Sequence, residues 1–368
     1  MNIGLCGFGV VGRGVYETVQ KRSDMKVKKV LCLEDIHLPD AQTVKDFSEI
    51  LTDPEIDTVV EAMGGLHPSF DFAYAALEAG KNFVTSNKAM VCTFYDQLVP
   101  LAAQKGVSLR CTAAVGGGIG WLSELERARR VQTINQVGGI MNGTCNYILD
   151  NMTRLGLGYD EALKQAQKLG YAEANPATDV DGIDTWHKVI LSANVAFGIS
   201  LDKITVPVSG IRNISAADVD CFKAHGKVCK LISTAKRTED GFNAYVQPTL
   251  VDAGSPEGAV PLNYNLITFI GQTSERMSFY GQGAGRYPTA YNVVQDLVDV
   301  TQGKSFYAPY GAPQAADNQE AHRYYVRGDW EGSIQEDWST GVITAPVPVS
   351  QMHQWVKDHP DAFIAAVD

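Results

Sequence analysis

The stretch Ile3-Gly4-Leu5-Cys6-Gly7-Phe8-Gly9-Val10-Val11-Gly12 spaces three glycines as G-x-G-x-x-G, between an apolar run and a helical pattern over 11–21. At a strand-to-helix turn, Gly7 permits the tight turn, Gly9 lets the backbone approach a pyrophosphate, and Gly12 lets the helix pack closely on the strand. The amides at the helix N-terminus then point at the phosphates. The stretch therefore predicts a dinucleotide-binding turn, with a glycine-rich turn of some other α/β fold as the alternative.

The composition is typical of a globular protein with two domains. The chain has 368 residues, of which 45% are hydrophobic and 20% charged, and its formal net charge is −11. This length exceeds one ordinary core. The negative charge disfavours nucleic acid and anionic membrane surfaces as partners. No stretch is long and apolar enough for a membrane span and the N-terminus lacks a basic leader, so we expect a cytoplasmic protein that acts on a small molecule.

The cysteines and histidines, seven of each, form no recognisable set of metal ligands. The cysteines are scattered without a C-x-x-C pair, and most lie in apolar runs, where a small buried thiol is the simplest explanation. We therefore expect no transition-metal site, and a reducing compartment fits the pattern.

The first 130 residues alternate short apolar runs with helical patterns. This rhythm predicts an α/β fold, with a parallel sheet covered by helices on both faces. Strands are predicted over 3–6, 27–33, 58–61, 82–85 and 107–112, with a helix over 69–79. Ligands bind such sheets beyond the carboxyl ends of the strands. From about residue 130 a mixed α+β domain is predicted, with strands over 134–141, 244–251, 266–270 and 324–327 and helices over 159–169 and 184–197.

Two lysines are candidates for proton transfer. Lys88 follows the strand 82–85, at the edge of the sheet where a nicotinamide and a substrate would meet, although a surface lysine in a loop is the alternative. Asp184 and Lys188 are four residues apart, so they share one face of a helix that is apolar almost all round. Because an unpaired buried charge is costly, we expect the two to pair. The pair is either structural or a proton-accepting lysine oriented by a carboxylate.

Polar residues crowd into the short loop before this helix. They are Tyr171, Glu173, Asp179 and Asp181. The acidic members either cap the helix, which we expect of Asp181, or bind a cationic group such as an amine, for which Glu173 is the candidate. Two further glycine-rich turns, 116–118 and 281–285, either let the backbone approach a ligand or form tight crossovers between domains.

Taken in order, these motifs resemble those of the homoserine dehydrogenase family from residue 1 to about 327. The matching stretches are G-F-G-V-V-G at 7–12, V-E-A-M-G-G at 60–65, A-L-E-A-G-K-N-F-V-T-S-N-K-A at 76–89, G-I-M-N-G-T-C-N-Y-I-L at 139–149, A-Q-K-L-G-Y-A-E at 166–173, D-V-D-G-I-D-T-W-H-K at 179–188, G-Q-G-A-G-R-Y-P-T-A at 281–290 and Y-Y-V-R at 324–327. The resemblance implies reversible NAD(P)-dependent oxidation of L-homoserine to L-aspartate 4-semialdehyde, a step toward threonine and methionine. It also implies three parts: a Rossmann-type dinucleotide-binding domain at 1–130, a substrate-binding and dimerisation domain at 131–300, and a C-terminal segment at 301–368 that returns to the first domain. A homodimer is therefore expected.

The resemblance further implies roles for individual residues. Lys188 matches the family's acid/base lysine, Lys88 its second active-site lysine, and Glu173 the glutamate that holds the substrate amine. Substrate binding is implied for Tyr171, Glu173, Asp179, Asp184, Gly143 and Thr144. Cofactor binding is implied for Gly7, Phe8, Gly9, Val10, Val11, Gly12, Glu34, Gly64, Ser86, Lys88 and Gly283.

One departure from the family pattern bears on the cofactor. Many NADP-using members end the second strand in arginine, which meets the 2′-phosphate. Here this position is Leu33, followed by Glu34 and Asp35. A carboxylate there binds a ribose 2′-hydroxyl and repels a phosphate. We therefore expect NAD to be preferred, with NADP as the alternative.

Two other departures lie near the expected substrate site. The family commonly has glutamate where this chain has Thr112, near a monovalent cation held by backbone carbonyls, here those of Val115, Gly117 and Ile119. The missing carboxylate argues against the cation. Gly120 also replaces a proline of the family. These changes leave room for an alternative function, an oxidoreductase with the same machinery that acts on another hydroxy- or amino-acid substrate. A catalytically silent NAD-binding module is disfavoured because both lysines are present.

The chain is expected to lack a regulatory domain. The roughly 40 residues after Arg327 are too few for the C-terminal ACT domain that some family members carry. Threonine feedback through such a module is therefore not expected.

Overall fold

The computed structural model describes residues 1–304 and 312–367, and the chain divides into two compact units. The first unit contains Met1–Arg130, Asn194–Ser200 and Gln282–Ala312, and the second contains Val131–Ala193, Leu201–Gly281 and Pro313–Asp368.

The first unit contains an open parallel sheet. Its strands lie in the order β3-β2-β1-β4-β5-β6, and every pairing is parallel. The strands are β1 (Asn2–Cys6), β2 (Lys26–Leu31), β3 (Gln42–Val44), β4 (Thr58–Glu61), β5 (Asn82–Thr85) and β6 (Leu109–Arg110). The helices of this unit are α1 (Val10–Val19), α2 (Ser48–Leu51), α3 (Ser69–Glu78), α4 (Lys88–Thr93), α5 (Tyr95–Lys105), α6 (Trp121–Ala128) and α12 (Arg286–Thr301), with a 3₁₀ turn at Thr112–Ala114. This strand order is that of a doubly wound Rossmann sheet, so the predicted fold class is confirmed.

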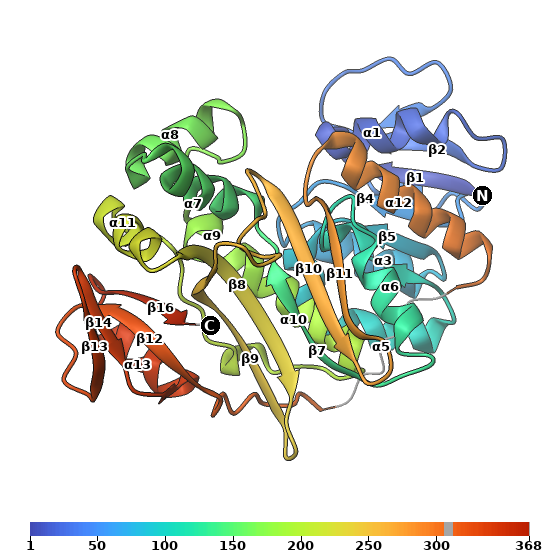
Figure 1. The fold of residues 1–368 in the computed structure, drawn as a ribbon. Coiled ribbons are helices and arrows are strands. Elements are labelled where there is room, and N and C mark those ends of the chain that lie inside the picture. The colour runs from blue at the N-terminus through green and yellow to red at the C-terminus, as the bar shows by residue number, and fades with distance from the viewer. Residues whose placement is uncertain (305–311, 368) are drawn as a thin grey trace. The chain divides into compact units, whose positions relative to one another are not determined.

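The core of the first unit combines the N-terminal residues with a helix that follows much later in the chain. Ile3 and Leu5 of β1 are fully buried, as expected of a parallel strand covered on both faces. Helix α12 packs beside α1 (Figure 1). Ala290 and Val293 of α12 belong to the same apolar cluster as Val15 of α1. The segment 282–304 therefore completes the dinucleotide-binding unit, although residues 282–300 were expected in the substrate-binding domain.

The second unit contains a mixed sheet with the strand order β11-β10-β7-β8-β9-β16-β12-β14-β13, and β15 pairs with β12. The strands are β7 (Ile134–Ile140), β8 (Lys227–Arg237), β9 (Phe242–Asp252), β10 (Tyr264–Gly271), β11 (Glu275–Gln282), β12 (Ala321–Arg327), β13 (Ile334–Trp338), β14 (Gly341–Thr344), β15 (Val347–Pro348) and β16 (Phe363–Val367). The helices are α7 (Gly143–Leu155), α8 (Tyr159–Lys168), α9 (Ala177–Val180), α10 (Ile183–Phe197), α11 (Ala216–Ala224) and α13 (Val349–Asp358), with a 3₁₀ turn at Lys203–Thr205. The last four residues of α10, 194–197, belong to the first unit.

The C-terminal part of the chain differs from the prediction. The expectation that residues 301–368 return to the dinucleotide-binding domain is wrong for 313–367, which belong to the second unit. There β16 pairs in parallel with β9, and β12 pairs antiparallel with β16, so these strands extend the mixed sheet (Figure 1). The pairing with β16 provides partners for backbone N–H and C=O groups of β9. Helix α13 packs on these C-terminal strands and forms a small separate core with them. That core contains Tyr324, Val326, Val347, Met352, Ile364 and Ala366.

Candidate active site

The glycine-rich loop between β1 and α1 has the shape that a dinucleotide requires. Gly7 has a φ of +94°, and a Cβ added to Gly12 would lie 2.1 Å from the Gly7 carbonyl oxygen. A Cβ on Gly9 would meet no atom within 4 Å, so the backbone there faces open space. Gly9 is also the N-cap of α1, and no side chain caps this helix. The uncapped amides and the open space fit a pyrophosphate.

Residues just after β2 lie where the adenosine ribose of a dinucleotide is expected. The side chain of Glu34 is largely exposed, and its carboxylate lies 3.6 Å from the Arg13 guanidinium. Lys45 pairs with Asp35 at 2.8 Å. Leu33 is 89% exposed. The two carboxylates predicted to select the cofactor therefore each have a basic partner, which the sequence did not indicate.

A buried carboxylate organises the next two strand ends. Glu61, at the end of β4, is fully buried. One of its oxygens accepts hydrogen bonds from the amides of Met63 (2.7 Å) and Gly64 (2.9 Å), and the other accepts from the Thr85 hydroxyl on β5 (2.5 Å). Glu61 was not predicted as a functional residue. The available signal was a charged residue that ends an apolar strand directly before a glycine pair.

The same network holds the loop that carries Lys88. The backbone N–H of Asn87 donates to the Thr85 hydroxyl at 2.9 Å, and the side-chain nitrogen of Asn87 donates to the Gly65 carbonyl oxygen at 2.7 Å. Asn87 is also the N-cap of α4, whose first residue is Lys88. Ser86 accepts a hydrogen bond from the Lys88 amide. Lys88 is half-buried at the carboxyl end of β5, where a ligand of such a sheet binds.

The predicted lysine–aspartate pair forms in the second unit. Lys188 and Asp184 are 7% and 5% exposed, and the ammonium lies 2.8 Å from the carboxylate, one turn apart on α10. The Lys188 ammonium also donates to the carbonyl oxygen of Met141 at 2.6 Å. Because the amine is held by one charged and one neutral acceptor, its position is fixed within a low-dielectric site.

Asn142 joins the acidic residues of this site and was missed by the sequence reasoning. Its side-chain nitrogen donates to Asp179 at 2.7 Å and to Asp184 at 2.8 Å, while its oxygen accepts from the Cys145 amide as the N-cap of α7. The signal was an asparagine directly before a helical pattern, which is typical of an N-cap. Burial, reinforced by the neighbouring charge of Asp184, raises the pKa of Asp179.

The other predicted substrate residues surround the start of α7 and the end of α8. A Cβ on Gly143 would lie 2.6 Å from the Asn263 carbonyl oxygen, so only glycine fits. The Thr144 hydroxyl donates to the carbonyl of Tyr171 at 2.7 Å. Glu173 and the ring of Tyr171 are exposed. Asp181, just before α10, pairs with Arg212 at 2.8 Å.

The predicted residues thus fall into two groups. The cofactor residues, Lys88 and Gly283 lie in the first unit, and Lys188 with the substrate residues lies in the second. Within the described residues, no group of three or more His, Cys, Asp and Glu side chains could hold a metal ion. The described helices are also too short or too polar to cross a membrane.

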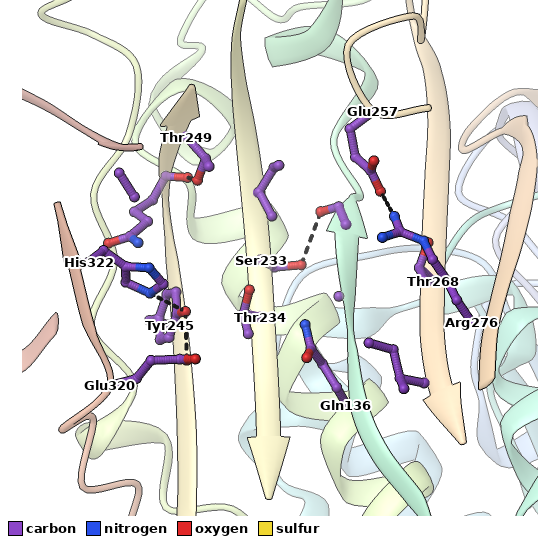
Figure 2. Close-up of a pocket in the computed structure, with 16 residues that line it drawn as sticks. Gln136, Ser233, Thr234, Tyr245, Thr249, Glu257, Thr268, Arg276, Glu320 and His322 are labelled. Carbon is purple, nitrogen blue, oxygen red and sulfur yellow. Dashed lines mark hydrogen bonds and ion pairs between the residues drawn. The ribbon is translucent and has the colours of Figure 1, made fainter. Parts of the chain in front are cut away.

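A separate cavity of about 220 Å³ lies on one face of the mixed sheet and contains none of the predicted site residues. Figure 2 shows Tyr245 with Glu320 and His322 at one side, and Arg276 with Glu257 at the other. The Tyr245 hydroxyl lies 3.0 Å from Glu320 and 2.9 Å from His322. The side chains that line the cavity are thus largely polar, and several of them form hydrogen bonds or ion pairs with one another.

A doubly wound sheet with an uncapped glycine loop, combined with a second unit that buries a lysine–carboxylate pair, defines the class of NAD(P)-dependent oxidoreductases. Comparison with known families agrees. Residues 7–112 match the NAD-binding domain model of homoserine dehydrogenase, and residues 121–298 match the homoserine dehydrogenase model. The chain belongs to the homoserine dehydrogenase family, whose members are oxidoreductases that act on a CH–OH group.

Individual relatives support this assignment. The chain is 37% identical to the homoserine dehydrogenase of Synechocystis sp. over 82% of its own length and 73% of the relative's. It is 34% identical to the Bacillus subtilis homoserine dehydrogenase over 84% and 76%. The crystal structure of a Thiobacillus denitrificans homoserine dehydrogenase superposes with a TM-score of 0.88 at 28% identity, covering 100% of this chain and 98% of that one. The predicted family and reaction are therefore confirmed, and the alternative of another substrate is not favoured.

Proposed function

We propose that this chain oxidises L-homoserine with Lys188 as the proton acceptor and Asp184 as the group that orients it. The observation that carries the proposal is the Lys188 ammonium, held at 2.8 Å from Asp184 and 2.6 Å from the Met141 carbonyl in a buried site. In the neutral amine, two N–H groups donate to these two acceptors, and the nitrogen lone pair is left for the proton of the substrate hydroxyl. A positioned amine of this kind supplies general-base catalysis.

The proton and the hydride leave the substrate carbinol in one step. Lys188 takes the hydroxyl proton, and bound NAD would supply the acceptor for the hydride. Lys88, at the carboxyl end of β5, stabilises the negative charge that develops on the oxygen. In the reverse direction Lys188 returns the proton to the alkoxide.

The acidic groups around Lys188 recognise the amino acid. Asp179 and Asp184 are tied together by Asn142, which sets the distance between their carboxylates. Glu173 and Tyr171, on the loop after α8, bind the substrate amine. Thr144 and Gly143 place the start of α7 beside this loop. An exposed carboxylate such as Glu173 suits an amine that arrives from solvent.

We further propose that the enzyme prefers NAD over NADP and works as a cytoplasmic homodimer in the synthesis of threonine and methionine. The preference rests on Glu34 and Asp35, which follow β2 where a 2′-phosphate would bind. Their partners Arg13 and Lys45 neutralise part of that charge, so the expected discrimination is moderate.

Initial rates test these proposals directly. NADH and NADPH formation is followed by absorbance with L-homoserine at mildly alkaline pH, with L-serine and L-threonine as control alcohols. Turnover with L-homoserine that is faster with NAD than with NADP supports both the substrate and the cofactor assignment. Equal or faster turnover with NADP would contradict the reading of Glu34 and Asp35, and no turnover in a protein that binds NADH would contradict the role of Lys188.

A further inference from the structure

The glycine-rich turn 116–120 lies directly against the segment that precedes α12, within the first unit. Gly117 has a φ of +50°, and a Cβ added to it would lie 2.5 Å from the carbonyl carbon of Gly283. The Gly118 amide donates to the Gln282 carbonyl oxygen at 3.0 Å. The turn and the start of α12 are therefore fixed to each other by backbone contact.

The family resemblance places the carbonyls of this turn around a monovalent cation, but in this chain two of them already accept hydrogen bonds. The side-chain nitrogen of Asn292, on α12, donates to the Gly117 carbonyl at 2.5 Å. The Trp121 amide donates to the Ile119 carbonyl at 2.7 Å. Asn292 is only 2% exposed, so its amide is held in place by packing. The positive end of an N–H dipole and a cation compete for the same carbonyl lone pairs.

The charges beside the turn are balanced by protein groups. The Thr112 hydroxyl and amide donate to the two oxygens of Asp296 at 2.7 and 2.8 Å. Asp296 also pairs with Arg110 at 2.9 Å, and the same guanidinium reaches Asp299 at 2.8 Å. Thr112 brings no negative charge, and each carboxylate has a basic partner, since Lys304 also pairs with Asp299 at 2.9 Å. The residues present therefore do not fit a monovalent cation, which needs several carbonyl oxygens free to replace its hydration shell.

We propose that the Asn292 carboxamide takes the structural place of that cation and that this enzyme is independent of Na⁺ and K⁺. Asn292 is then a positioning residue: it holds the Gly117 carbonyl and so fixes the turn that leads through Gly120 into α6. The consequence for turnover rests on the function proposed above, whereas the consequence for stability does not.

Asn292→Asp is the discriminating variant, because it keeps the size of the side chain and replaces the N–H donor by an oxygen. A carboxylate facing the Gly117 carbonyl repels it in the absence of a cation and forms a cation site in its presence. Melting temperature and kcat/KM are measured for the wild type and the variant in tetramethylammonium, sodium or potassium chloride, each at about 0.1 M so that screening is equal.

For the wild type we expect kcat/KM to agree within about twofold among the three salts, because a cation with no site shifts no equilibrium. For Asn292→Asp in tetramethylammonium we expect kcat/KM to fall about tenfold, as for one lost buried hydrogen bond, together with a lower melting temperature. Sodium or potassium should restore part of both, since a ligand that binds only the folded state stabilises it.

Asn318→Asp is the matched control. Asn318 is equally buried, and its side-chain nitrogen donates to the Thr205 carbonyl at 2.8 Å in the second unit. Its variant should lose stability to the same extent in all three salts. Activation of the wild type by sodium or potassium beyond about twofold would overturn the proposal. It would also be overturned if the melting temperature of Asn292→Asp were the same in all three salts. If the wild type lacks homoserine turnover, the proposed function fails, while the melting temperatures still decide the place of the amide.

Discussion

Removing the amine of Lys188 separates a catalytic pair from a structural one. In Lys188→Met the side-chain volume is largely kept, and Asp184 retains the hydrogen bond from Asn142 at 2.8 Å. At an effective dielectric constant of about 20, two unit charges at the observed 2.8 Å attract by about 6 kcal/mol. Desolvation of both groups offsets much of this, so the loss of one partner should cost about 3 kcal/mol, at the lower end for buried pairs.

The expected results are a melting temperature lowered by about 6–12 °C for a unit of this size and a kcat lowered by about 10²–10⁴-fold. The affinity for NADH, measured by fluorescence titration, should stay unchanged because Lys188 lies outside the cofactor unit. Adding Asp184→Asn removes the second charge. The double variant should therefore regain about 2 kcal/mol of stability relative to the sum of the single variants, while kcat stays low.

Two results would refute this reasoning. If Lys188→Met keeps more than about a tenth of the wild-type kcat, the lysine is not the proton acceptor and the pair is structural. If the loss of stability in the double variant equals the sum of the losses in the two single variants, the two charges are not coupled, and the site is not of low dielectric. A structural pair would show the stability loss alone.

Three other changes should give distinct results. Leu33→Arg combined with Glu34→Ser should raise the ratio of kcat/KM for NADP over that for NAD by about tenfold or more, as for one charged contact to the 2′-phosphate; an unchanged ratio would show that the ribose contact lies elsewhere. Gly9→Ala should leave the melting temperature unchanged, because the added Cβ meets no atom, but it should weaken NADH binding at least about tenfold by blocking the pyrophosphate. Gly12→Ala should lower both the melting temperature and the affinity for NADH. Intact NADH binding in Gly9→Ala would contradict the assignment of the loop. Burial and the charge of Asp184 raise the pKa of Asp179 in the folded protein. The free energy of unfolding is therefore highest below the pKa of this carboxyl in the unfolded chain, and it falls as pH rises through the higher pKa of the folded protein. Asp179→Asn should therefore melt higher than the wild type at pH 7, with the gap closing toward pH 4, and should raise KM for L-homoserine; a gap independent of pH would contradict the ionisation argument.

The local parts of the fold and site were predictable, because their signals lie within a few residues. Strand 58–61 and helix 69–79 follow from a short apolar run and from helical periodicity, and the structure has them at Thr58–Glu61 and Ser69–Glu78. The pairing of Asp184 with Lys188 follows from their spacing of four in an apolar helix.

The rest depends on pairings that local patterns do not encode. β8 alternates in burial only over 231–236 and carries Lys227, Lys230 and Lys236 among its apolar residues, so it was not predicted. The expected strand 107–112 shortens to Leu109–Arg110, and a 3₁₀ turn begins at Thr112, whose amide and hydroxyl donate to Asp296 of α12, nearly two hundred residues away in the chain. The placement of the last segment failed for the same reason, because β16 pairs with β9 and β12 and its own sequence does not specify these partners.

The position of α12 in the chain has a consequence for biosynthesis. Its residues Val293 and Leu297 fill the core beside α1, although residues 131–193 and 201–281 of the second unit are translated between the two helices. When the first 130 residues leave the ribosome, the apolar face of α1 therefore has no helix to cover it, and it stays exposed until residues 286–301 emerge. The cofactor unit cannot mature before residues 131–281, which include Lys188, have been made. A nascent chain that stalls between them should be a client of chaperones rather than a folded NAD-binding protein.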